Sequence, residues 1–254
     1  MDAVLKVENL TKVFSRKDQD DFTAVDDISF ELMPGECLAI IGESGSGKTT
    51  AVNMITRLVD PTKGTIELDG EDITAVKGKN LRNVYKKMQM VFQTPADSFD
   101  PRCTLGDGIS ESLRNFGMSK KDARAEAVRL LERCGLGEEF ADRYPHQVSG
   151  GQCQRAAIAR ALALKPKVLI CDEATSALDV TIQKEVLDLL NELRSAQGDN
   201  LSILFICHDI SLVQQFCDRV LVMYHGRIVE QGIPDEVIKN PQDPYTQRLI
   251  DSVL

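Results

Sequence analysis

Short apolar stretches that fit β-strands alternate along the chain with stretches of helical periodicity. The strand-like stretches lie at residues 4–7, 24–32, 36–41, 65–68, 88–92, 168–171 and 201–207, and residues 220–224 and 227–230 predict a hairpin around His225-Gly226. Helical periodicity covers residues 49–59, 181–197 and 211–217. Alternation of this kind predicts an α/β protein with a mostly parallel sheet.

A helical block at residues 94–160 interrupts this alternation. Ser119 and Asp122 form the pattern of a capping box, and the stretch after them places apolar residues on one helix face: Ala123, Ala127, Leu130, Leu131 and Cys134. Residues 77–87 are polar, and no regular element is predicted there. We therefore predict a single domain over residues 1–254, with a core at 1–93 and 161–254 and a helical subdomain at 94–160.

Composition and charge exclude several classes of protein. The chain has 254 residues, of which 43% are apolar and 27% charged, and its net charge of −9 argues against nucleic acid as a partner. The seven cysteines are odd in number and widely spaced, which predicts free thiols in a reducing compartment. The first ten residues lack the apolar run of a signal peptide, and no apolar stretch approaches the roughly 18 residues of a membrane helix. A membrane span would have to come from a partner.

The pattern GxxxxGK[ST] of a phosphate loop stands between a predicted strand and a predicted helix. Its residues are Gly42, Glu43, Ser44, Gly45, Ser46, Gly47, Lys48 and Thr49. Glycines let consecutive backbone N–H groups turn inward as an anion nest, and the helix N-terminus adds positive charge. Lys48 would contact the β- and γ-phosphates, the Thr49 hydroxyl would ligate Mg²⁺, and Thr50 would lie near a phosphate. A flexible surface loop, the alternative, would not explain the flanking strand and helix.

Two carboxylates follow the apolar strand at residues 168–171. Asp172 is expected beside the phosphate loop, where it would hold Mg²⁺ directly or through water. Glu173 is then placed to orient or deprotonate an attacking water. An apolar run that ends in Asp-Glu is a weak signal alone, but it gains weight from the phosphate loop upstream.

A second glycine-rich helix start occurs at residues 148–152. Ser149 and Gln152 form a capping-box pattern, and Gly150 and Gly151 between them could make a second anion nest. A well-capped helix without further function is the alternative. Two nests for one nucleotide per chain suggest a dimer in which the second nest grips the γ-phosphate held by the other subunit.

Together these motifs resemble those of the ATP-binding subunits of ABC transporters, and the resemblance covers nearly all of the chain. Residues 148–152 resemble the family signature LSGGQ, with Val148 in place of Leu, and Cys153 is a further small departure. The resemblance implies a P-loop NTPase core with a mostly parallel sheet, an N-terminal antiparallel β subdomain and an inserted α-helical subdomain. It also implies hydrolysis of ATP to ADP and phosphate, with Mg²⁺ as the metal.

Further residues take expected roles from this resemblance alone. Gln93 resembles the Q-loop glutamine, which contacts Mg²⁺ and senses the membrane partner, and His208 resembles the switch histidine, which contacts the γ-phosphate. Residues 176–179 resemble the D-loop, which places Asp179 at the nucleotide. Phe14 matches the aromatic residue that stacks on adenine, and Phe22 is its rival.

Subfamily marks resemble the ATPases of peptide and nickel importers. They are Phe92-Gln93-Thr94-Pro95 with Ser98, Asp100-Pro101 and Arg102, then residues 173–180, then Asn240-Pro241 with Pro244-Tyr245-Thr246. The implied function is ATP hydrolysis that powers import of oligopeptides, dipeptides or nickel. The implied partners are a second ATPase subunit, identical or different, two transmembrane permease subunits and, indirectly, an extracytoplasmic solute-binding protein. The implied location is the cytoplasmic face of the cell membrane.

Two alternatives from other classes stay open at this point. A soluble ABC ATPase could act in an enzyme complex, such as one of phosphonate metabolism, or in translation or DNA repair. A small-molecule kinase would share the phosphate loop but would leave residues 148–152 unexplained.

Overall fold

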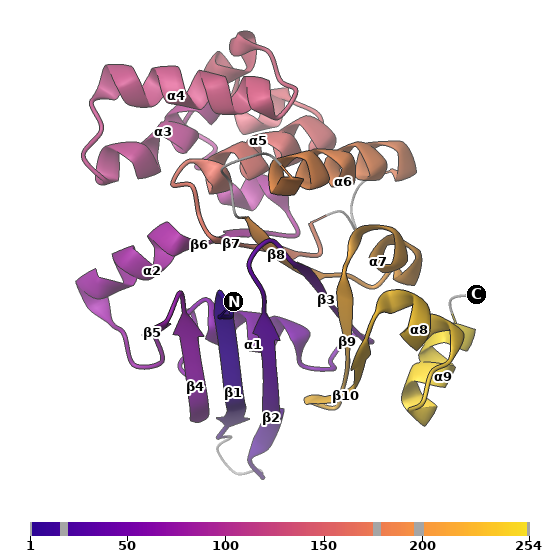
Figure 1. The fold of residues 1–254 in the computed structure, drawn as a ribbon. Helices are drawn as coiled ribbons and strands as arrows, with labels where there is room; N and C mark the ends of the chain where they lie inside the picture. Colours follow the sequence, from indigo (N-terminus) through magenta and orange to yellow (C-terminus); the bar gives the residue numbers. More distant parts are fainter. Residues whose placement is uncertain (1, 16–19, 175–178, 196–200, 253–254) are drawn as a thin grey trace.

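Two β-sheets form the centre of the fold in a computed structural model that describes residues 2–15, 20–174, 179–195 and 201–252 (Figure 1). The smaller sheet is antiparallel, has the order β2-β1-β4-β5 and consists of β1 (Leu5–Phe14), β2 (Phe22–Leu32), β4 (Lys63–Leu68) and β5 (Glu71–Asp72). The larger sheet has the order β10-β9-β3-β8-β7-β6 and consists of β3 (Cys37–Ile41), β6 (Met88–Val91), β7 (Val168–Asp172), β8 (Ser202–Ile206), β9 (Arg219–Tyr224) and β10 (Arg227–Gly232).

All strands of the larger sheet run parallel except β10, which pairs with β9 as the predicted antiparallel hairpin. Strands β3, β7 and β8 are almost entirely buried, which explains why their sequences are continuous apolar runs rather than alternating ones. The predicted mostly parallel sheet and N-terminal antiparallel subdomain are confirmed.

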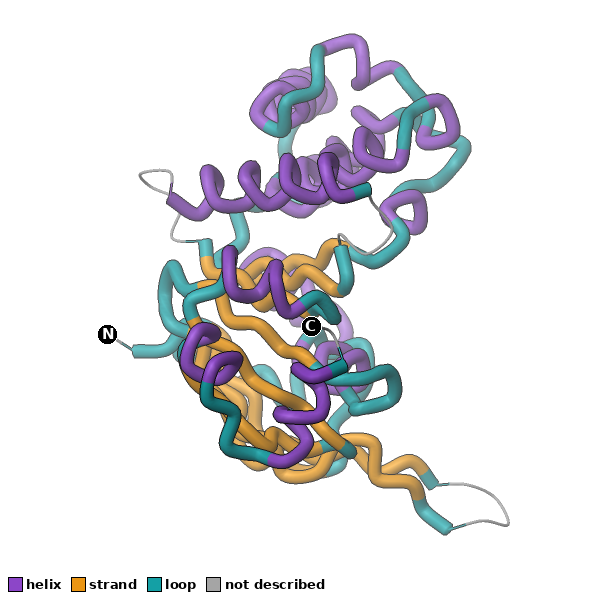
Figure 2. The backbone as a smooth tube through the Cα atoms, turned by 90° about the vertical axis from the view of Figure 1, so that its right-hand side faces the viewer, coloured by secondary structure: helices purple, strands orange, loops and turns teal. Residues whose placement is uncertain are grey.

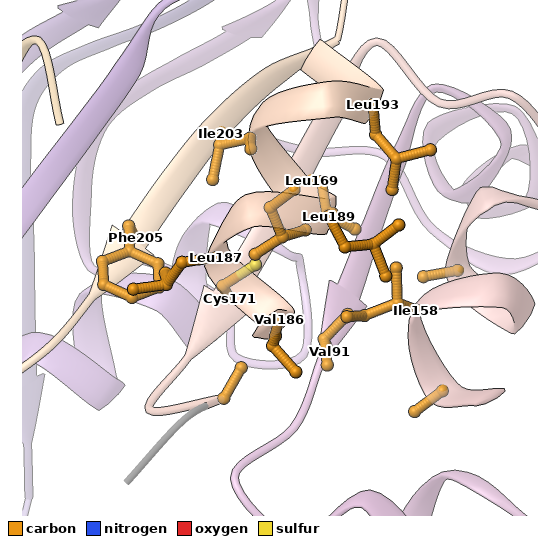
Figure 3. Close-up of a cluster of buried hydrophobic side chains, with 14 of the residues drawn as sticks. Val91, Ile158, Leu169, Cys171, Val186, Leu187, Leu189, Leu193, Ile203 and Phe205 are labelled. Atoms are coloured by element: carbon orange, nitrogen blue, oxygen red, sulfur yellow. The ribbon is translucent and has the colours of Figure 1, made fainter. Parts of the chain in front are cut away.

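Alternate residues of the larger sheet enter two separate cores, because successive side chains of a strand point to opposite faces. Leu38, Ile40 and Ile170 pack with the smaller sheet and with α1 (Lys48–Ile55). Leu169, Cys171 and their neighbours pack on the opposite face against α5 (Gly150–Leu162) and α6 (Val180–Ser195), as Figure 3 shows. The sheet is thus held from both sides, and its strand ends are fixed where the motifs lie.

Helices α3 (Leu105–Asn115) and α4 (Lys120–Arg133) pack with α5 at the top of Figures 1 and 2, where α5 lies between them and the larger sheet. The hydroxyls of Thr104, Ser119 and Ser149 cap their N-termini. The predicted apolar face of α4 is buried, and Cys134 just after it is buried as well. The inserted helical part of the predicted fold is therefore confirmed.

Several elements differ from the sequence prediction. Helix α1 ends at Ile55 rather than at residue 59, because Arg57 adopts a left-handed φ of 61° that cannot continue a helix. Helix α2 (Leu81–Lys87) lies in the polar region where none was predicted; it buries only Val84 and so has no apolar stripe to recognise.

The C-terminal tail carries two short helices, α8 (Pro234–Lys239) and α9 (Pro244–Asp251), which the sequence analysis also missed. Helix α7 (Ile210–Phe216) matches its prediction to within one residue. All seven cysteines are free, with five buried and Cys103 and Cys217 half-buried, as predicted. Within the described part of the chain, no helix combines the length and the apolar character needed to cross a bilayer.

Candidate functional site

The phosphate loop connects the central strand β3 to the N-terminus of α1. Gly42 and Gly47 have φ values of 148° and 106°, in the region that favours glycine. A Cβ on Gly42 would lie 2.2 Å from the carbonyl oxygen of Met223, and one on Gly47 would lie 2.5 Å from that of Ala24. Both glycines are therefore required by close backbone approach as well as by conformation.

Lys48 is buried, with 4% of its surface exposed, and its ammonium group lies inside the loop. Nζ donates to the carbonyl oxygens of Gly42 at 2.7 Å and Glu43 at 2.9 Å. Burial lowers the Lys48 pKa, while the charges of Glu173 and Asp172 oppose this shift. The ammonium group is held at the place where the loop would receive an anion.

A cavity of 220 Å³ opens on this loop. Its lining consists of Phe22, Ala24, Ser44, Gly45, Gly47, Lys48, Thr49, Thr50, Glu173 and His208. Phe22, rather than Phe14, is among these residues, and the two face each other as register partners at the end of the β1–β2 pair. Phe14 lies under the ammonium group of Lys12, which is 5.0 Å from its ring centroid. Ala24 has no distinguishing sequence signal, and the sequence analysis missed it.

Three predicted catalytic residues converge at the carboxyl ends of neighbouring parallel strands. Glu173 follows β7 in a left-handed conformation, with φ of 49°. The Gln93 side chain, which comes after β6, donates from Nε2 to Glu173 Oε2 at 2.8 Å. His208, which comes after β8, contacts Glu173 Oε1 through Nε2. This edge of a parallel sheet is where ligands of such folds bind.

His208 also connects this cluster to the phosphate loop. Its Nδ1 lies 3.1 Å from the carbonyl oxygen of Gly42, so Nδ1 carries a proton. The other ring nitrogen, Nε2, contacts Glu173. His208 therefore bridges the phosphate loop and the predicted base.

Asp172 ends β7 and is half-buried. Its pKa is raised, first by burial and then by the negative charge of Glu173, while Lys48 and His208 act in the opposite direction. A divalent cation here would relieve the repulsion between the two carboxylates. The carboxylate of Asp172, the hydroxyl of Thr49 and the amide oxygen of Gln93 are hard oxygen donors, which suit Mg²⁺. The residues present thus fit the predicted metal.

The second glycine-rich motif forms the N-terminus of α5. Ser149 Oγ accepts from the Gln152 N–H at 3.3 Å, and Gln152 Oε1 accepts from the Ser149 N–H at 2.9 Å, so the predicted capping box is present. Ser149 and Gly150 are exposed, and Gly151 packs against Ile182 of α6. None of these residues is among the described residues that line the phosphate-loop cavity.

Asp179 lies at the start of α6, where its Oδ1 accepts from the Ile182 N–H at 3.1 Å. It acts as a helix cap in this structure. The rest of the predicted D-loop, residues 176–178, lies outside the described residues.

The sequence profile of the ABC transporter family matches residues 25–176, which span the phosphate loop, the second glycine motif and both carboxylates. The chain belongs to the ABC transporter family. It is 44% identical over 256 residues to a probable peptide ABC transporter ATP-binding protein of Sinorhizobium fredii, covering 98% of this chain and 72% of that protein. It is also 44% identical over 252 residues to the oligopeptide transport ATP-binding protein OppF of Streptococcus mutans, covering 98% and 81%.

A solved ABC cassette has the same architecture. The dimeric, post-hydrolysis structure of the ATP-binding cassette MJ0796, bound to ADP and Pi, superposes with a TM-score of 0.81 at 29% identity, covering 91% of this chain and 98% of that one. The predicted ABC ATPase is therefore confirmed, and the reaction of this family member is ATP hydrolysis. The comparisons support a transport ATPase rather than the soluble alternative.

Proposed function

We propose that this chain hydrolyses ATP to power the import of oligopeptides or dipeptides through a membrane ABC transporter, at the cytoplasmic face of the membrane. The convergence of Gln93, Glu173 and His208 on the phosphate loop carries the catalytic part of this proposal. The peptide substrate is supported by the two relatives, whose names specify peptide and oligopeptide transport.

Residues 42–49 receive the triphosphate in this proposal. Lys48 exchanges the carbonyl oxygens of Gly42 and Glu43 for phosphate oxygens, which are stronger acceptors because they are charged. Thr49, Asp172 and Gln93 hold Mg²⁺, which neutralises charge on the phosphate oxygens when bound. Thr50 contacts a phosphate, and Phe22, or Phe14 across from it, stacks on the adenine ring.

Glu173 is the general base. Its carboxylate takes a proton from the attacking water, and Gln93 and His208 fix its two oxygens in place. His208 also contacts the γ-phosphate from its position beside Gly42. His208 contacts one carboxylate oxygen of Glu173 in this structure, and this contact must open before that oxygen can accept the proton of the water.

The second nest, Ser149 to Gln152, and Asp179 complete the site of a partner ATPase subunit, which is either a second copy or a related chain. Ser149 and Gly150 are exposed at the positive end of α5, as the capture of a partner's γ-phosphate requires. Neither Ser149 nor Gly150 is among the described residues that line the cavity at this chain's own phosphate loop. The dimeric MJ0796 cassette supports this arrangement.

An apolar groove supports the proposed docking of a permease. A cavity of 390 Å³ runs between the core and the helices at residues 94–160. We propose that these helices form a subdomain that moves relative to the core. Leu58, Phe92 and Phe116 line it with 57%, 36% and 41% of their surfaces exposed. A permease segment seated in this groove would contact Phe92. Phe92 directly precedes Gln93, the residue whose amide donates to Glu173.

Purification of the tagged full-length chain from detergent-solubilised membranes of its own cells tests this function. We expect two membrane-spanning permeases to co-purify, and ATPase activity that responds to peptide. Lys48→Ala should keep the permeases but weaken nucleotide binding by about 10- to 100-fold, because a charge-assisted contact is lost.

Leu58→Arg should release the permeases without changing nucleotide affinity. Ile233→Arg is the matched control, since Ile233 is 54% exposed but lies outside the groove. Co-purification of soluble enzyme subunits instead of permeases would support the soluble alternative.

A further inference from the structure

The last described helix reaches back to the phosphate loop. Tyr245, the second residue of α9, is only 4% exposed, and its hydroxyl accepts from the Glu43 N–H at 2.9 Å. The two residues are 202 positions apart in the chain. Tyr245 belongs to the tail motif Pro244-Tyr245-Thr246, which has no part in the proposed mechanism.

Several contacts fix the start of α9 and the Tyr245 ring independently of the loop. Asp243 Oδ1 accepts from the Tyr245 N–H at 2.7 Å and so caps α9. The Glu230 carboxylate accepts from the N–H groups of Gln242 at 2.9 Å and Asp243 at 3.1 Å. The Tyr245 ring stacks on Tyr224, with centroids 3.9 Å apart and planes inclined by 22°. The hydroxyl is therefore held in place by contacts outside the loop.

The peptide group between Gly42 and Glu43 joins Tyr245 to Lys48. Its N–H, that of Glu43, donates to the Tyr245 hydroxyl, and its carbonyl oxygen, that of Gly42, accepts from Lys48 Nζ at 2.7 Å. The next carbonyl oxygen, that of Glu43, accepts from Lys48 Nζ at 2.9 Å and from the Ser46 N–H at 3.2 Å. Burial raises the pKa of the Tyr245 hydroxyl, so the group stays neutral at physiological pH. A neutral hydroxyl can accept from this peptide without adding negative charge beside a phosphate site.

We propose that Tyr245 is a positioning residue of the phosphate loop. Its hydroxyl fixes the peptide group between Gly42 and Glu43, and this peptide group holds the loop and Lys48 in the conformation that receives the triphosphate. The inference rests on the proposed role of residues 42–49 in phosphate binding. The tail motif Pro244-Tyr245-Thr246 would thus contribute to nucleotide binding, although no residue of α9 is among the described residues that line the phosphate-loop cavity.

Tyr245→Phe tests the proposal because it removes the hydroxyl and keeps the ring stack. We expect the Kd for ADP with Mg²⁺, measured by calorimetry on the full-length chain, to rise by about 2- to 10-fold, which corresponds to one lost hydrogen bond. KM for ATP should rise with it, while kcat stays within about twofold of the wild type, since the contact serves ground and transition states alike.

Tyr224→Phe is the matched control. It removes the other hydroxyl of the same stack, for which the described residues provide no hydrogen-bond partner, and nucleotide affinity should be unchanged. An affinity of the Tyr245→Phe protein within about 1.5-fold of wild type would overturn the proposal, even if its Tm fell. An equal loss in both variants would also overturn it. Failure of the wild type to bind ADP would instead refute the proposed role of the loop.

Discussion

The Gln93 amide donates to the Glu173 carboxylate at 2.8 Å, although the two residues are 80 positions apart. This contact joins the strand end nearest the apolar groove to the proposed general base. Movement of Gln93 by a docked permease would thus act directly on the residue that activates water.

Replacement of Glu173 by Gln should abolish turnover without loss of ATP binding. The amide keeps the size of the side chain but cannot accept the proton of the attacking water, so kcat should fall by about 10²- to 10⁴-fold. Steady-state ATPase assays and calorimetry on the same preparation check both parts. Normal turnover would remove Glu173 from the role of base.

Asp172→Asn should increase stability at neutral pH. The folded-state pKa of Asp172 is raised above its ordinary value of 3.8, so the folded protein binds this proton more tightly than the unfolded chain does. Stability due to this group is therefore greatest below pH 3.8 and falls as the pH rises through the raised pKa.

Thermal unfolding without metal measures this difference. The Asn variant should have the higher Tm at pH 7, and its advantage should disappear near pH 3.5, where Asp172 is protonated in both states. If Asp172 also ligates Mg²⁺, added Mg²⁺ with ADP should stabilise the wild type more than the variant. A lower Tm of the variant at pH 7 would contradict the sign of the pKa shift.

Ser149→Arg should prevent the ATP-dependent dimer. A long cationic side chain at the exposed start of α5 would block the proposed approach to the partner's γ-phosphate. In the Glu173→Gln background, light scattering should show a dimer with ATP that the Ser149→Arg substitution removes, whereas nucleotide affinity of the single chain stays within about twofold. Ser195→Arg is the control: it places the same cationic side chain at an exposed residue, the last of α6, and should leave the dimer intact. A normal dimer carrying Ser149→Arg would refute the shared site.

Gly151→Ala should destabilise the fold despite the higher helix propensity of alanine. The new Cβ would lie 2.5 Å from Ile182 Cγ2, so α5 and α6 would have to separate. We expect a loss of about 1–3 kcal/mol from overpacking, partly offset by about 1 kcal/mol of propensity. Urea unfolding in the wild-type and Ile182→Ala backgrounds tests the cause, because the penalty should nearly disappear without the Ile182 side chain.

The sequence predicted the core of the site because its motifs combine chemistry with local structure. Gly42 and Gly47 predict a tight turn. Asp172 and Glu173 directly follow the apolar stretch at residues 168–171, which predicts a buried strand. Parallel strands bring their carboxyl ends together, so the convergence of these residues follows from the strand pattern alone. Gln93 and His208 needed the family resemblance, since a single Gln or His after a strand has no distinctive pattern.

The missed features depend on contacts between distant segments. Helix α2 has a single buried residue, Val84, and α8 has only six residues, so neither presents a periodic apolar face. The choice between Phe14 and Phe22 depends on the pairing of β1 with β2, which composition does not reveal. The contact between Tyr245 and Glu43 has no local sign in either sequence segment.

The hydrogen bond between Tyr245 and Glu43 also bears on the order in which the site forms during synthesis of the chain. At about 5–20 residues per second, a ribosome needs roughly 10–40 s to add the 202 residues that separate them. The pairing of strand β3 is delayed as well, because its neighbours β8 and β9 are synthesised much later than β3. The phosphate loop of a nascent chain therefore acquires the sheet neighbours of β3 and its contact with Tyr245 only after most of these 202 residues have been added.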